Sequence, residues 1–130
     1  MADANAETVT APESFDKRLE RWLDRILPGA VRNNIDGEPA LYRWLVLPIP
    51  FLKRAVVIHE FVADDDLVPH LHPRSFISIG FRGGYVDVVT LDGTETERLW
   101  KAPWYRRYRA GTTHRVRLVG GKPCWTLCIK

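Results

Sequence analysis

From Leu41 to the end of the chain, the sequence is a series of short apolar stretches separated by turn residues. Their wealth of Val, Ile, Leu and aromatic residues favours β-strands. The turn signals between them include Gly83-Gly84, Asp92-Gly93 and Gly120-Gly121. About eight strands at this regular spacing predict an all-β sandwich or small barrel. The stretches are LYRWLVL, AVVIHEFV, SFISIGF, YVDVVTL, ETERLW, WYRRYR, HRVRLV and CWTLCI.

The segment before these strands has a helical pattern. Ser14 can cap a helix and Pro28-Gly29 can end it, so we predict one helix over residues 14–27. It follows a disordered tail (1–12) and precedes a loop through Asn33, Asn34 and Asp36-Gly37. The β-barrel is expected over 41–130, within one domain of residues 13–130. The apolar stripe that must pack on the barrel or a partner comprises Phe15, Leu19, Trp22, Leu23, Ile26 and Leu27.

The length, cysteine content and net charge of the chain limit the classes of function that it can have. A chain of 130 residues is one domain, and it has neither a membrane-length apolar run nor a signal peptide, so we expect a cytoplasmic protein without membrane contact. Cys124 and Cys128 are then expected to be free, buried thiols. The net charge of +3 favours an anionic ligand slightly and does not favour nucleic-acid binding.

The chemistry-bearing residues are histidines. His70 and His72 are two residues apart, so in an extended segment both side chains point to the same face. His114 begins a later strand that can lie opposite them in a closed sheet. Three neutral imidazoles could hold Fe(II), Zn, Mn or Ni and leave positions open for water or substrate. His59, in the preceding apolar strand, is expected to be a core or supporting residue.

Two motifs resemble those of the cupin superfamily. His70-Leu71-His72 matches the HxH of its first motif, Gly83 fits that motif's final glycine, and Gly111-Thr112-Thr113-His114 matches the GxxH of its second. The resemblance covers about residues 41–130 and is closest to small cupin-like proteins of bacteria and phages. It implies a single cupin-like barrel (a double-stranded β-helix or jelly roll) with the predicted helix outside, and a homodimer.

The sequence departs from the cupin pattern at one ligand. Phe76 and Ile77 stand where the first motif has a glutamate. The resemblance therefore leaves two readings open: a three-histidine metal site, as in the thiol dioxygenases of this superfamily, or a metal-free site, as in its sugar-nucleotide epimerases. Glu60 could replace the missing acid if it pointed inward.

Several residues could surround the metal. Ser78 follows His72 at even spacing, and Tyr85 follows the Gly83-Gly84 turn. In WYRRYR, Arg107 and Arg109 share one face with Tyr105, while Arg106 and Tyr108 share the other. We expect Arg107, Arg109 and Ser78 to bind substrate, since a guanidinium matches a carboxylate or phosphate with two hydrogen bonds. Tyr85 and Tyr108 are the candidate proton donors.

The leading hypothesis is a metal-dependent, Fe(II)-type oxygenase acting on a small polar or anionic molecule. The first alternative is a metal-free sugar-nucleotide isomerase or epimerase, with a histidine as base and a tyrosine as acid. The second is a non-enzymatic cupin that binds a small ligand. The fold alone does not choose among them, because one scaffold hosts many chemistries.

Overall fold

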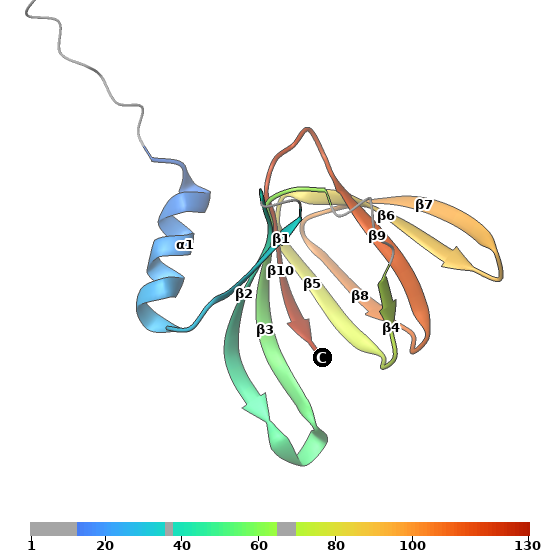
Figure 1. Ribbon diagram of the computed structural model, residues 1–130, viewed down its shortest axis with the longest axis horizontal. Helices are drawn as coiled ribbons and strands as arrows, with labels where there is room; N and C mark the ends of the chain where they lie inside the picture. Colours follow the sequence, from blue (N-terminus) through green and yellow to red (C-terminus); the bar gives the residue numbers. More distant parts are fainter. Residues whose placement is uncertain (1–12, 36–37, 65–69) are drawn as a thin grey trace, which may run out of the picture.

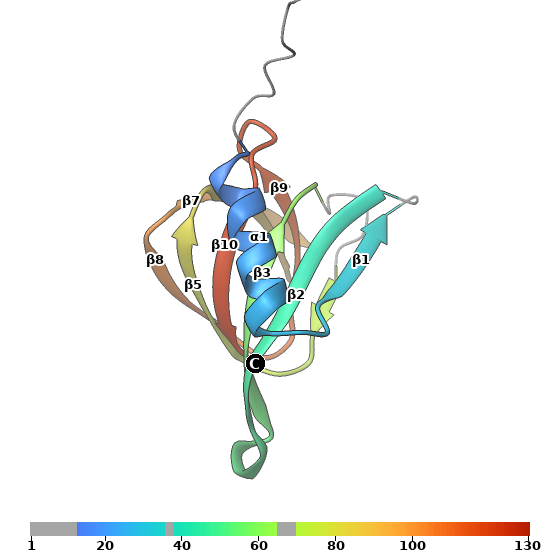
Figure 2. The ribbon, with the colours of Figure 1, turned by 90° about the vertical axis from the view of Figure 1, so that its left-hand side faces the viewer.

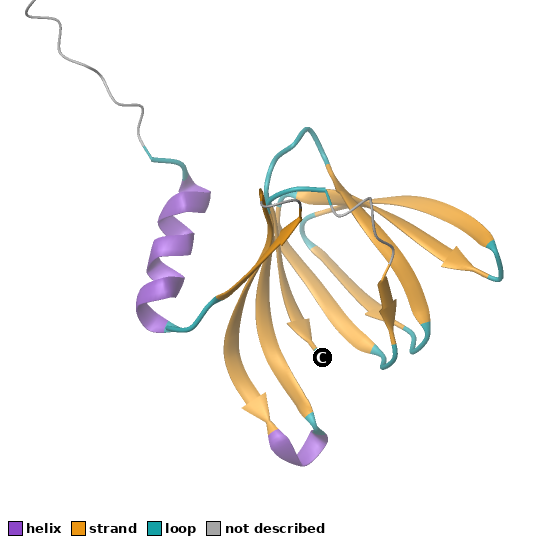
Figure 3. Cartoon of the chain, in the orientation of Figure 1, coloured by secondary structure: helices purple, strands orange, loops and turns teal. Residues whose placement is uncertain are grey.

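The computed structural model describes residues 13–35, 38–64 and 70–130. The predicted tail, residues 1–12, lies outside the described residues. Within the described part, the chain forms one α-helix and strands in two antiparallel sheets, which confirms the all-β architecture with a single N-terminal helix (Figures 1 and 3).

The larger sheet has six strands in the order β1-β2-β3-β10-β5-β8. Their bounds are β1 Val31–Ile35, β2 Glu38–Ile49, β3 Arg54–Phe61, β10 Cys124–Ile129, β5 Phe76–Arg82 and β8 Trp104–Tyr108. A short 3₁₀ helix, Pro50–Leu52, joins β2 to β3.

The smaller sheet has four strands in the order β4-β9-β6-β7. Their bounds are β4 His70–His72, β9 Thr112–Leu118, β6 Gly84–Leu91 and β7 Thr94–Lys101. The hairpin expected at Asp92-Gly93 is confirmed, since Leu91 pairs with Thr94 across it and both turn residues have positive φ, at 50° and 78°.

The inner core joins the two sheets. Because side chains alternate along a strand, every second residue faces the space between the sheets. Tyr85 from β6 and Val116 and Leu118 from β9 pack there with Trp104 from β8 and Cys124 from β10. Both sheets therefore depend on one shared apolar cluster.

The prediction of a loop through Asn33 and Asn34 is wrong, because both residues belong to strand β1. Val31 pairs with Arg43 and Ile35 with Glu38, so β1 and β2 form an antiparallel hairpin. VRNNI has no alternation of apolar and polar residues, and its strand conformation comes from backbone pairing with β2.

Helix α1 (Phe15–Ile26) lies against the outer face of the six-stranded sheet, in front of β2, β3 and β10 in Figure 2. Leu23 packs with Tyr42, Trp44 and Trp125 in a second apolar cluster. Trp44 and Trp125 stack with ring centroids 5.6 Å apart. The sheet thus separates two cores, one on each side.

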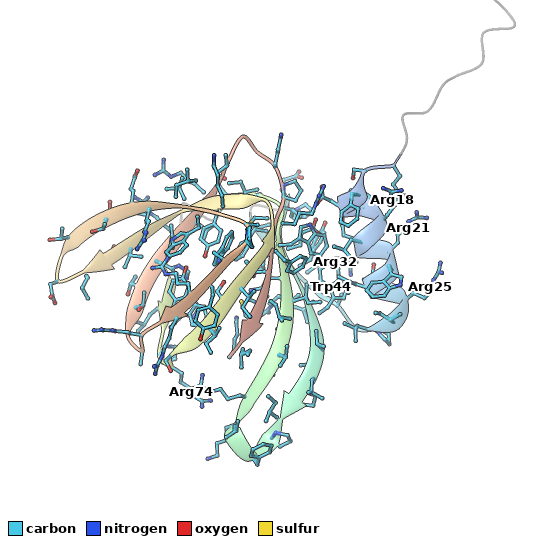
Figure 4. The ribbon with its side chains drawn as sticks, turned by 180° about the vertical axis from the view of Figure 1, so that it is seen from behind. Arg18, Arg21, Arg25, Arg32, Trp44 and Arg74 are labelled. Carbon is cyan, nitrogen blue, oxygen red and sulfur yellow. The ribbon has the colours of Figure 1, made fainter. Side chains whose placement is uncertain are left out.

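Two hydrogen bonds fix the helix on this surface. The indole N–H of Trp125 donates to Asp16 Oδ1 (2.7 Å), and that of Trp44 donates to Asp24 Oδ1 (2.9 Å). Asp24 also accepts from Arg32 (2.8 Å), which Figure 4 shows near Trp44. Both indoles can be buried because each polar N–H has a carboxylate partner.

Only part of the predicted apolar stripe of the helix is buried against the sheet. Leu23 is buried and its neighbours Leu19 and Leu27 pack on the same cluster, whereas Trp22 and Ile26 are 55% and 46% exposed. Residues four apart share a helix face, and the Leu19-Leu23-Leu27 row is the one that meets the two indoles. Trp22 and Ile26 face solvent, whereas Phe15, at the start of the Leu19 row, is 49% exposed and has the Arg82 guanidinium 4.4 Å over its ring.

Further apolar surface lies on the β2–β3 hairpin, where Leu45, Leu47 and Leu52 are each more than half exposed and Phe51 is 85% exposed. The expected homodimer stays a prediction. The exposed apolar side chains of this hairpin are the place to test for contacts between two copies of the chain. The described part of the chain contains no helix with the length and apolar character needed to cross a membrane.

Glu60 of β3 lies beneath the helix and is fully buried. Neither carboxylate oxygen has a hydrogen-bond partner among the described residues. Burial, together with the nearby negative charges of Glu20 and Asp16, raises the pKa of Glu60 to about 8, against the opposing influence of Lys17 and Arg32. Glu60 therefore favours its neutral form beneath the helix and does not face the histidines.

The raised pKa of Glu60 predicts a pH-dependent stability. The pKa is 4.5 without the protein environment and about 8 in the folded state, so between these values the folded protein holds a proton that the unfolded chain has released. The free energy of unfolding therefore falls as pH rises through this window and levels off above it. Glu60→Gln removes this ionisation and should stabilise the protein at pH 8 by about 2–4 kcal/mol, with little effect at pH 4.5.

Urea unfolding of both proteins at the two pH values measures the difference. The exposed Glu38→Gln serves as the matched control and should leave the midpoint unchanged at both. An equal effect of Glu60→Gln at pH 4.5 and pH 8 would contradict the buried, neutral carboxyl.

Candidate functional site

Two of the predicted histidines meet at one point between β4 and β9. The register pairs His70 with His114 and His72 with Thr112. The Nε2 atoms of His72 and His114 lie 2.8 Å apart. The side chain of His70 lies outside the described residues, although its backbone belongs to β4.

A carboxylate from the neighbouring strand β6 lies behind His114. Asp87 Oδ1 accepts a hydrogen bond from His114 Nδ1 (2.7 Å), and both side chains are buried. With its proton on Nδ1, a neutral His114 keeps the lone pair on Nε2, which faces His72. The bond thus fixes both the tautomer and the ring orientation, as carboxylates do behind metal-binding histidines.

The second oxygen of Asp87 binds residues of the opposite sheet. Asp87 Oδ2 accepts from the hydroxyl of Tyr108 (2.9 Å) and forms an ion pair with Arg106, both from β8. Since Tyr108 donates its proton to Asp87, the Tyr85 hydroxyl, 2.7 Å away, is the donor to Tyr108. One hydrogen-bonded network therefore runs from Tyr85 to His72 and joins the two sheets.

The electrostatics of this network follow from its burial. Burial alone would raise the pKa of Asp87, but the hydrogen bonds from His114 and Tyr108, together with the positive charge of Arg106, hold it below its ordinary value. Burial raises the pKa of Tyr85 and that of Tyr108, and the Asp87 charge adds to both. The site therefore contains one ionised carboxylate surrounded by neutral phenol donors and one guanidinium.

An aromatic wall stands where cupins carry the motif glutamate. Phe76 faces inward, with its ring stacked on Tyr108 (centroids 4.4 Å apart, 9° between planes) and 4.5 Å from the His72 ring. Ile77 has the opposite orientation on the strand. The fourth ligand position of the cupin pattern is thus apolar in this chain.

Tyr85 and Tyr108, the expected proton donors, both belong to the network. Ser78 is buried on the same face of β5 as Phe76, is the register partner of Arg106, and hydrogen-bonds to Cys128. It lies inside the barrel beside the network.

Arg107 and Arg109 are not brought to the histidines. Arg107 and Arg109 are exposed and line a separate open pocket with Ser75 and Ala110. The arginine that faces inward is Arg106, which lies over the Tyr108 ring at 4.0 Å. The alternation of side chains predicted that Arg107 and Arg109 would lie on one face of the strand and Arg106 and Tyr108 on the other. Only the closed sheet determines which of these two faces points into the barrel.

Sequence reasoning missed Asp87 and the role of Arg106. The available signal for Asp87 was a charged residue inside the apolar strand YVDVVTL, and an acid buried in such a strand needs hydrogen-bond donors and an opposite charge. Those partners come from residues 19 and 27 positions later, Arg106 and His114. Their proximity depends on strand pairing.

The other histidine and the cysteines behave as core residues. His59 is 4% exposed, and its Nδ1 lies 3.6 Å from Cys128 Sγ. Cys124 and Cys128 are free and buried, as predicted. Glu60 points to the helix side of β3, so the hypothesis that it replaces the missing acid is wrong.

The histidine pair passes a test of fit to a metal ion. Two nitrogen ligands at ~2.0–2.2 Å from one ion are compatible with a separation near the 2.8 Å between these Nε2 atoms. His114 also has the supporting carboxylate that such ligands use. Among the described side chains, no group of three or more His, Cys, Asp or Glu residues is placed to hold a metal.

Comparison with known proteins shows the fold. No family model matches the chain, and no curated protein sequence matches it. Among solved structures, it is similar to the Fe(II) form of HppE, with a TM-score of 0.68, 8% identity, and coverage of 78% of this chain and 55% of that chain. The chain has a cupin-like fold. It spans only about 55% of the length of HppE.

Two smaller proteins agree. A predicted oxalate decarboxylase from Thermotoga maritima has a TM-score of 0.58 at 16% identity, covering 79% of this chain and 90% of that chain. KdgF from Halomonas sp. has a TM-score of 0.54 at 19% identity, and the match covers 73% of this chain and 83% of KdgF. The predicted single cupin-like barrel is therefore confirmed. Its interior is the space between the six-stranded and the four-stranded sheet of this chain.

The network predicts that Asp87 is important for stability. Asp87→Ala leaves Arg106 without its carboxylate in a part-buried position, and removing one partner of a buried ion pair costs about 3–5 kcal/mol. Glu95→Ala, which breaks the exposed pair with Arg115, should cost about 0–1 kcal/mol. Urea unfolding at pH 7 compares the two variants, and equal small losses would contradict the central role of Asp87.

Proposed function

We propose that this protein is a metal-binding cupin that holds a divalent ion, with Fe(II) favoured, between His72 and His114. The observation that carries the proposal is the approach of their Nε2 atoms to 2.8 Å with Asp87 bound to the far nitrogen of His114. His70 is proposed as the third ligand, because the register pairs it with His114.

The proposed reaction class is oxidation of a small polar or anionic molecule. Fe(II) in such a site would supply redox chemistry with dioxygen. Three histidine ligands would leave coordination positions open, as an oxygenase requires. The support from comparison is the fold of HppE, whose structure contains Fe(II), at 8% identity.

The residues of the chain have defined parts in this proposal. Asp87 orients the His114 ring and selects the tautomer whose lone pair is on Nε2, while Arg106 balances the Asp87 charge. Phe76 and Tyr108 form a stacked apolar wall beside His72 that restricts water. The Asp87 carboxylate, which only accepts, sets the direction of the hydrogen bonds, so that Tyr108 donates to Asp87 and Tyr85 donates to Tyr108.

Metal content tests the proposal directly. Elemental analysis after reconstitution with Fe(II), and separately with Zn, Mn or Ni, should give near-stoichiometric metal for the wild type and background levels for His72→Ala and His114→Ala. Competition with a chelator should show a 10–100-fold weaker affinity for Asp87→Asn, because that change removes the carboxylate behind a ligand. His59→Gln, a buried histidine outside the pair, is the matched control and should retain the metal.

The absence of metal from the reconstituted wild type would overturn the proposal. The same would follow from equal metal content in the His72→Ala and His114→Ala variants, provided that circular dichroism shows both folded. Function would then be sought in metal-free isomerisation, which survives chelation, or in ligand binding.

A further inference from the structure

The two arginines that the barrel leaves outside define a second pocket. Arg107 and Arg109 line it with Ser75 and Ala110, at the end of the barrel where the β4–β5 and β8–β9 turns meet. We propose that this pocket is a separate binding site for a phosphate group, on the outer side of β8. It goes beyond the metal site and does not depend on it.

Arg107 leaves β8 on the face opposite to the one that carries Arg106 and Tyr108 toward the histidine pair. Arg106 and Tyr108 point into the barrel, where they bind Asp87. Arg107 lies between them in sequence, so its side chain leaves the other face of the strand. Tyr105 on that outer face is 66% exposed. A molecule in the outer pocket would therefore not reach the histidines through the sheet.

The charge of this pocket is uncompensated. Neither Arg107 nor Arg109 has an acidic partner among the described residues, whereas Arg115 and Arg117 on β9 pair with glutamates of β7. Two unpaired guanidiniums two residues apart repel each other unless an anion lies between them. The pocket therefore offers a positive potential that no described side chain neutralises.

A third arginine supports the pocket from behind. Arg54 of β3 donates to the backbone oxygen of Ser75 and, at 3.4 Å, to its Oγ. Because Ser75 Oγ accepts from Arg54, its own proton remains available to a ligand in the pocket. Arg54 thus adds positive charge and orients the Ser75 hydroxyl as a donor.

The pocket lining consequently offers hydrogen-bond donors on its polar side chains: two planar guanidinium forks and one hydroxyl. No carboxylate is among the described residues that line it. This arrangement suits an anion with several acceptor oxygens in three dimensions, and guanidinium forks bind phosphate with paired hydrogen bonds. Because the pocket is open, either free phosphate or the phosphate group of a larger molecule can enter.

Calorimetric titration with inorganic phosphate, and separately with glycerol 2-phosphate, tests the proposal at low and constant ionic strength. The wild type should bind at least one of these probes saturably, and the tighter probe identifies the source of the phosphate group. Arg107→Gln/Arg109→Gln should weaken binding at least tenfold. Ser75→Ala should weaken it by a smaller factor.

The matched control is Arg18→Gln/Arg25→Gln, which removes the same charge from exposed positions on helix α1, where both residues are labelled in Figure 4. Its affinity should stay within twofold of the wild type. Equal weakening in both double variants would overturn the proposal, since the effect would then follow net charge. Absence of saturable binding of both probes to the wild type would also overturn it.

The His72→Ala variant, titrated in the presence of a chelator, separates this site from the metal centre. Its phosphate affinity should equal that of the wild type, whatever the outcome of the metal measurements. Loss of phosphate binding in this folded variant would place the anion at the histidines and contradict a separate outer pocket.

Discussion

The buried carboxylate of Asp87 is the interaction on which the interior of the barrel depends. A charge with no exposed surface is stable only when hydrogen bonds and opposite charges surround it. Asp87 meets this requirement with His114 from β9 and with Arg106 and Tyr108 from β8. Because β8 and β9 belong to different sheets, the same carboxylate joins the sheets and orients the histidine.

This arrangement couples the candidate chemistry to the fold. The ring of His114 cannot turn without breaking its bond to Asp87, and Asp87 cannot move without leaving Arg106. Such support from rigid strands is what a metal ligand or a proton-transferring group needs in order to keep one geometry. The stacked Phe76 and Tyr108 rings complete the support with an apolar wall in place of the fourth cupin ligand.

The six-stranded sheet has a different role on each face. Its inner face contributes Arg106, Tyr108 and Ser78 to the barrel interior, while its outer face carries the stacked Trp44 and Trp125 beneath the helix. Helix α1 is therefore part of the domain's apolar packing, fixed by Asp16 and Asp24. The same alternation places Arg107 outside, one residue from the inward Arg106.

The sequence by itself determined the local features of this protein. Period-two stretches and glycine turns predicted the strands and the hairpin at Asp92-Gly93, and the i, i+2 spacing of His70 and His72 depends only on extended geometry. The cupin motifs further identified His114 as a residue that would meet His72, and the structure brings their Nε2 atoms together.

Only the tertiary structure decided the partners of these residues. It placed Asp87 behind His114, turned Arg106 inward and Arg107 outward, made VRNNI a strand, and selected the Leu19-Leu23-Leu27 row of the helix for burial. Each of these depends on the pairing of segments far apart in the chain. Alternation divides the side chains of a strand into two faces, but the closure of the sheets determines which face is the interior.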